Sequence, residues 1–159
     1  MRLRRYLLTG LMALTLLALV AVPVMSYEFT SNVKSFQGIK AQSSSTAVTG
    51  SAVDLTGYGE AMIVLDCGTT ASTGTLDVTV TSSAATAGTY AAVSGAVFTQ
   101  VTPSNDDAIY VGRLRVDPAK PFIKIVGTAA TAASVYSVTV HAGEGTKARP
   151  LQTPQWTTF

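Results

Sequence analysis

The chain has 159 residues, which is enough for one ordinary domain and too few for two. Charged residues make up 13% of it, against roughly 25% in an average soluble protein. After residue 26, eight basic residues stand against nine acidic ones, so this part of the chain has a net charge near −1. This balance excludes a basic nucleic-acid-binding surface as the main function, and we expect no nucleic-acid partner.

The chain begins with a hydrophobic segment. Residues 6–27 contain no charged side chain, and Arg2, Arg4 and Arg5 precede them. The Leu- and Ala-rich stretch 7–22 predicts a helix, and Val24 and Ser26 fit the positions that a signal peptidase inspects. Three interpretations of residues 1–26 stay open: a cleaved secretory signal, a membrane anchor that contacts lipid through residues 6–25, or a hydrophobic arm buried in a protein assembly.

Residues 27–46 have no clear period and are interpreted as a linker. From Val48 onward the hydrophobic period is two, which predicts strands. The expected strands are 61–65, 76–81, 109–116, 122–126 and 135–140, and the uninterrupted apolar run 61–65 suggests burial on both faces. The alternation predicts a core that contains Leu76, Val78, Val80, Leu114, Val116, Ile123 and Ile125.

Short strands separated by Gly-, Ser- and Asp-rich turns, with no amphipathic helix between them, predict an all-β domain over residues 47–145. The expected architecture is an antiparallel β-sandwich, either a jelly roll or an immunoglobulin-like fold. Residues 146–159 contain two prolines and no strand pattern, which indicates an extended C-terminal arm. Trp156 and Phe159 on this arm are the candidate interaction residues, since exposed aromatic side chains often dock on a neighbouring molecule.

The chain is poor in residues that do chemistry. Its single cysteine, Cys67, excludes an intrachain disulfide and a cysteine-based zinc site. Its single histidine, His141, has no Ser, Asp or Glu at motif spacing, and Asp106-Asp107 is better interpreted as a solvated turn than as a cation site. We therefore expect no catalytic residue, no metal, no cofactor and no small-molecule substrate.

Several motifs occur in a distinctive order. They are the entry 52–58 (AVDLTGY), the apolar strand 61–66 that ends in Asp66, the segment 74–80 (GTLDVTV), the hairpin segments 87–90 (AGTY) and 97–102 (VFTQVT), the strand 110–114 (YVGRL) and the basic-aromatic strand 120–126 (KPFIKIV). In this order they resemble a group of small β-sandwich structural proteins of tailed bacteriophages, described as head decoration or minor virion proteins. The likeness spans roughly Val53 to Val140. The chain departs from the pattern at residues 81–86, where the family usually has a charged turn, and in its hydrophobic N-terminal segment.

The resemblance implies a non-enzymatic protein associated with the capsid, whose partners are the major capsid protein or further copies of itself. The alternative is an exported or membrane-anchored β-sandwich of the bacterial surface or periplasm, of the adhesion type, which residues 1–26 would deliver.

Overall fold

The structure is a computed structural model, and it describes residues 33–143 and 156–158. Within these residues it contains strands and no helix, as the sequence predicts. The strands are β1 (Val33–Ser44), β2 (Ala47–Thr49), β3 (Val53–Asp54), β4 (Glu60–Thr70), β5 (Thr75–Ser83), β6 (Ala91–Val97), β7 (Ala108–Arg115), β8 (Phe122–Ala130), β9 (Ser134–Gly143) and β10 (Trp156–Thr158). The helix expected in residues 7–22 lies outside the described part of the chain.

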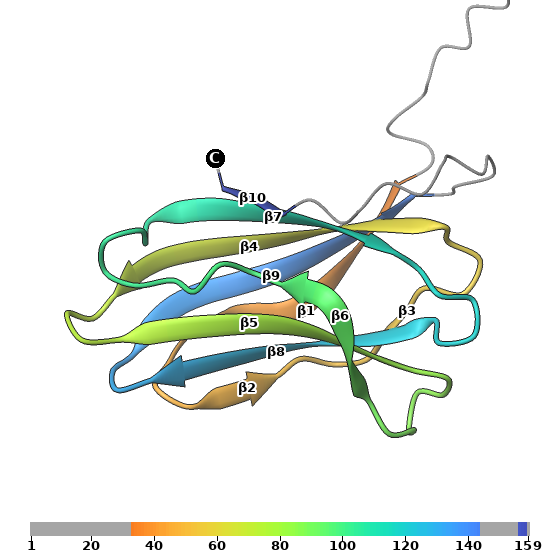
Figure 1. Cartoon of the computed structure of the whole chain (residues 1–159), viewed down its shortest axis with the longest axis horizontal. Helices are drawn as coiled ribbons and strands as arrows, with labels where there is room; N and C mark the ends of the chain where they lie inside the picture. The colour runs from red at the N-terminus through yellow and green to blue at the C-terminus, as the bar shows by residue number, and fades with distance from the viewer. Residues whose placement is uncertain (1–32, 144–155, 159) are drawn as a thin grey trace, which may run out of the picture.

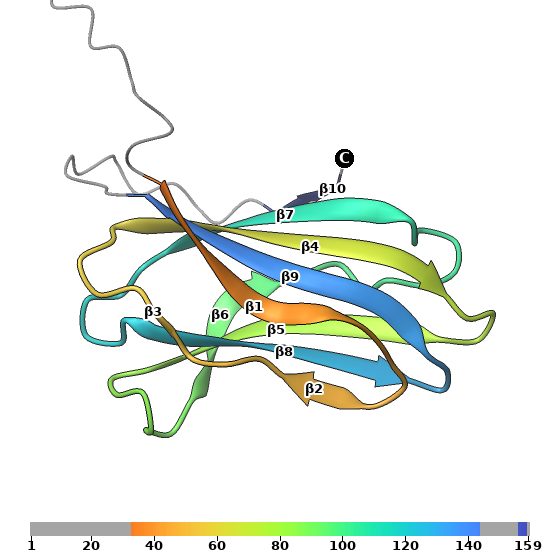
Figure 2. The same ribbon diagram turned by 180° about the vertical axis from the view of Figure 1, so that it is seen from behind.

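The strands form two antiparallel sheets that lie one over the other (Figures 1 and 2). The first sheet has the order β1-β9-β4-β7-β10, and the second has the order β2-β8-β5-β6, with β3 also paired to β8. This arrangement confirms an all-β, antiparallel architecture. The finer choice between a jelly roll and an immunoglobulin-like fold stays a prediction.

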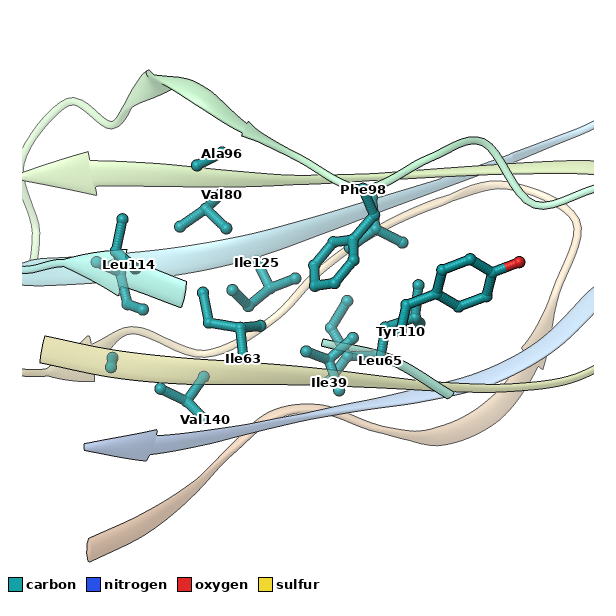
Figure 3. Packing of buried hydrophobic residues seen from close by; sticks show 14 of the residues in the cluster. Ile39, Ile63, Leu65, Val80, Ala96, Phe98, Tyr110, Leu114, Ile125 and Val140 are labelled. Atoms are coloured by element: carbon teal, nitrogen blue, oxygen red, sulfur yellow. The ribbon is translucent and has the colours of Figure 1, made fainter. Parts of the chain in front are cut away.

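The core lies between the two sheets and consists of side chains from alternate positions of the strands. Figure 3 shows Ile63 of the first sheet pointing toward Ile125 of the second. Every residue of the predicted core is buried: Leu76, Val78, Val80, Leu114, Val116, Ile123 and Ile125. Burial of this apolar area, at about 25 cal/mol per Å², is the main driving force for folding.

One expected strand is placed differently from the prediction. The run 61–65 was expected to be buried on both faces, but within this run only Ala61, Ile63 and Leu65 are buried. Met62 is 36% exposed and Val64 is half-buried, because both point away from the core. The outer face of the first sheet has no layer covering it in the described structure, so β4 follows the one-sided alternation of an antiparallel sheet despite its apolar sequence.

The interpretation of residues 27–46 as a linker is wrong between Val33 and Ser44. These residues form β1, which pairs with β9 from Val33 opposite Gly143 to Ser44 opposite Ser134. Two register shifts, between Gln37 and Ile39 and between Ile39 and Gln42, interrupt the ladder. The bulges and the position of β1 at the edge of the sheet remove the regular alternation, so the sequence shows no period there.

The chain passes from one sheet to the other between β1 and β2. The Ser44 hydroxyl donates to the Thr46 carbonyl at 3.0 Å and supports this short turn. After β2 the backbone of Gly50 lies against that of Gly38, and a Cβ atom on Gly50 would stand 1.9 Å from the Gly38 carbonyl oxygen. Only glycine fits such a contact. This crossing joins the two sheets covalently along one side of the sandwich.

The strand expected at residues 122–126 is longer in the structure, where β8 continues through Gly127 to Ala130. A Cβ atom on Gly127 would lie 2.7 Å from the Tyr136 ring, which packs over this residue from β9. A glycine inside a strand often marks such a close approach, and here it provides the space for a fully buried aromatic ring.

The C-terminal arm was expected to contain no strand, and the structure differs at Trp156–Thr158. These residues form β10, which pairs antiparallel with β7, with Trp156 opposite Gly112 and Thr158 opposite Tyr110. Three residues are too few to give a detectable period. The arm therefore adds a short edge strand to the first sheet (Figure 1).

We expect Leu114→Ala to lower the free energy of unfolding of the full chain by about 2–5 kcal/mol, because it truncates a buried side chain and leaves a cavity. The control is Arg113→Ala, which removes an exposed side chain whose ion pair with Glu60 contributes at most about 1 kcal/mol. Chemical denaturation measures both. A larger loss for Arg113→Ala than for Leu114→Ala would show that the register of β7 is shifted by one residue.

Candidate functional site

The structure brings one pair of polar side chains together that the sequence did not reveal. Ser35 of β1 and His141 of β9 are directly opposite in the register, and the Ser35 hydroxyl lies 2.8 Å from His141 Nδ1. They are 106 positions apart in the chain, and the linker interpretation of residues 27–46 hid Ser35. Only the pairing of β1 with β9 could have indicated this contact.

The Ser35–His141 pair lacks the parts of a nucleophilic site. Such a site needs an acidic group that orients the histidine and backbone N–H donors at the reacting oxygen. On β4, the residue opposite His141 is Met62, and no carboxylate bonds to His141 in the part of the chain that the structure describes. Ser35 and His141 line neither the groove beside β6 nor the groove beside the turn 55–59. The pair acts as an exposed cross-strand hydrogen bond.

Cys67 lies on the inner face of β4, where it is buried. Its thiol donates a hydrogen bond to the Gly68 carbonyl at 3.3 Å. Burial raises the pKa of this thiol, and the negative charges of Asp106 and Asp107 act in the same direction. A thiol with a raised pKa is a poor nucleophile at neutral pH, so Cys67 behaves as a small apolar core residue.

The two carboxylates at 106–107 serve the turn before β7. An oxygen of Asp106 accepts the Thr70 backbone N–H at 2.6 Å, and Asp107 has a φ of 50°, in the left-handed region that Asp tolerates. No group of three or more His, Cys, Asp or Glu residues within 33–143 and 156–158 could hold a metal ion.

Two shallow grooves are open to solvent. One, of about 210 Å³, lies between β6 and the end of β7, and Val93, Leu114, Arg115 and Lys120 contribute to its lining. The other, of about 300 Å³, is lined mainly by the turn 55–59 and two prolines. Neither groove gathers a buried charged group, so neither has the convergent polar groups of a small-molecule site.

The outer face of the first sheet carries exposed apolar side chains beside the charged residues Glu60, Asp66, Arg113 and Arg115. Met62, Ile109 and Val135 are exposed on it by 36%, 49% and 46%. The ion pair between Arg113 Nη2 and Glu60 Oε2, at 3.5 Å, stands at one end of this face. Exposed apolar side chains therefore share this face with charged ones.

The edges of the sheets are the remaining feature of interest. The second sheet ends in β6, whose sequence Ala-Ala-Val-Ser-Gly-Ala-Val carries no charge or proline to guard it against pairing. The first sheet ends in β10, which contains Trp156. Of the two candidate interaction residues, the backbone of Trp156 is thus placed at a sheet edge, and Phe159 lies outside the described residues.

Comparison with known protein-family models and with curated proteins found no match to this chain.

We expect no hydrolase, transferase or oxidoreductase activity in the pure protein, because Ser35, His141 and Cys67 stand without the partners that each chemistry needs. Broad substrate panels for these three classes measure this. A turnover that disappears in His141→Ala or Cys67→Ala would overturn the prediction.

Two buried tyrosines provide a matched pair of substitutions. The Tyr110 hydroxyl donates to the Asn105 carbonyl, whereas the Tyr136 hydroxyl is buried with no hydrogen-bond partner among the described residues. We expect Tyr110→Phe to lower the free energy of unfolding by about 1 kcal/mol, and Tyr136→Phe to leave it unchanged or raise it. Thermal and urea unfolding measure both. The opposite ranking would contradict the packing around β9.

The same tyrosines predict how stability depends on alkaline pH. Burial raises the pKa of both Tyr110 and Tyr136. The unfolded chain releases these protons near pH ~10, while the folded chain retains them, so stability falls as the pH rises above that value. Tyr136→Phe should reduce this alkaline loss.

Proposed function

We propose that this chain is a non-enzymatic structural protein of a phage virion, associated with the capsid as a decoration or minor head protein. Its β-sandwich and terminal arms bind the major capsid protein, further copies of the chain, or both. One observation carries the proposal: the chain end forms an added strand on the edge of a sheet whose core is already closed by a second sheet. An edge that accepts a strand is a common means of attachment between proteins.

Other properties of the molecule support this proposal. The described residues contain no constellation for catalysis and no metal-binding cluster. The low charge of the chain and its Ser- and Thr-rich strands suit packing between copies. The resemblance of residues 53–140 to small phage sandwich proteins points to the same class.

A second candidate function rests on the uncharged segment 6–27. This segment favours an exported or membrane-anchored β-sandwich of the cell envelope, of the adhesion type. No helix within 33–143 and 156–158 is long and apolar enough to cross a bilayer, and the segment itself lies outside these ranges.

The test is whether the chain belongs to the particle. We expect the full-length protein to co-sediment with purified virions at a constant ratio to the major capsid protein, measured by gel densitometry and mass spectrometry. Recovery of the protein only in envelope fractions would favour the second candidate and overturn the first. The mature N-terminus found by mass spectrometry also distinguishes a cleaved signal from a retained segment.

We expect deletion of residues 150–159 to lower occupancy on the particle, while the melting temperature of the chain changes by only a few degrees. The reason is that this deletion removes β10, a three-residue edge strand, and leaves every other described strand in place. A buried aromatic anchor is commonly worth about 2 kcal/mol or more at an interface, and repetition around a shell amplifies its loss. Unchanged occupancy, or a collapsed melting temperature, would assign the arm to the fold alone.

A further inference from the structure

β10 differs from the other strands in how it is attached to the fold. It is a three-residue strand at the end of the chain, and it contacts the free edge of β7. From this placement we infer that, in an assembly, β10 of one copy pairs with the β7 edge of a second copy. The donor is Trp156–Thr158 and the acceptor is the backbone of residues 110–112. The inference rests on the proposed function, for which it identifies the partner and the contact.

The acceptor edge exists without β10. On its other side β7 pairs with β4 over the whole strand, from Arg115 opposite Glu60 to Ala108 opposite Cys67. The inner face of β7 is anchored as well, because Tyr110 and Leu114 are buried in the core. β7 therefore keeps its place whichever chain supplies the added strand, and its unpaired N–H and C=O groups accept any antiparallel partner.

The length of the connection permits exchange. β9 ends at Gly143. Across the first sheet, β10 lies three strand spacings of ~4.8 Å from β9, and along the strand direction Trp156 is offset from Gly143 by three residues. The straight path is then about 18 Å. The 12 residues between them can span up to ~43 Å, more than twice this distance. The connection is therefore longer than the closed pairing requires.

Exchange preserves the contacts that β10 makes. Thr157 lies opposite Val111 in the closed chain, and the same pair forms when the two residues belong to different copies. Strand exchange of this kind is a low-cost route to association, because only the identity of the chain changes. Tethering within one chain gives the closed form an effective concentration of about the millimolar range, so copies crowded on a shell compete with it and dilute copies do not.

The test uses cysteine pairs in the full-length chain, purified in a mild detergent, with Cys67→Ala as the background. One tagged chain carries Val111→Cys and a second, untagged chain carries Thr157→Cys. Opposed residues on neighbouring strands have Cβ atoms about 4.5–5.5 Å apart, within reach of an oxidative disulfide. In the matched control, the tagged chain carries Ser137→Cys instead of Val111→Cys. Ser137 lies on the outer face of β9, which does not border β10. A single chain with both Val111→Cys and Thr157→Cys reports closed pairing.

We expect the double variant to cross-link within one chain at ~10 μM, and the mixture at ~1 mM to give covalent heterodimers roughly tenfold above the Ser137→Cys control. Cross-links confined to single chains at both concentrations would overturn the exchange, as would the absence of any disulfide between positions 111 and 157. Sedimentation of a chain ending at Gln155 separates this failure from that of the proposed function. If chains that end at Gln155 still associate with one another, the strand exchange is wrong but the proposed function is not contradicted. If purified particles lack the full-length protein, the proposed function is wrong.

Discussion

The structure depends on the burial of alternate side chains between two antiparallel sheets. Because the side-chain period of a strand is two, the residues that fill the core also determine which residues face outward. Burial of Ile63 and Leu65 on β4 leaves Met62 and Val64 on the outer face, although all four are apolar. The same constraint brings Ser35 and His141 together on that face. Which side chains are exposed on the outer face is therefore determined by which residues fill the core.

The two long sides of the sandwich differ in how the two sheets are connected there. On one side the chain crosses between the sheets, and the contact of Gly50 with the Gly38 carbonyl holds this crossing together. On the other side β6 and β7 are not joined into one sheet, and a groove lies between them. Each sheet therefore has an edge strand on both sides, β1 and β2 beside the crossing and β10 and β6 beside the groove.

Polar side chains near β7 that could suggest a functional site instead make hydrogen bonds that stabilise the fold. Asp106 accepts the Thr70 amide, and Asn105 caps the Thr102 amide at 2.6 Å while its own carbonyl accepts the Tyr110 hydroxyl. These bonds fix the long connection between β6 and β7 and set the start of β7.

Much of the fold could be predicted from the sequence, since β5, β7 and β9 alternate strongly and each buries one face. β1 could not, because its bulges and edge position erase the period of its apolar residues. β10 is too short for any period, and its partner is set by the position of β7 in space rather than by local sequence. For the candidate site, the aromatic arm was visible in the sequence, but its pairing with residues 110–112 was not. The Ser35–His141 contact needed the register of two strands that are distant in the chain.

The β7 edge is a strand-accepting surface that residues 156–158 occupy. Amide hydrogen exchange of the full-length protein, compared with a chain that ends at Gln155, measures this pairing. We expect alternate amides within residues 110–112 to lose protection in the shortened chain, while amides of the central strands β4 and β9 keep theirs. Equal protection of residues 110–112 in both chains would contradict the pairing.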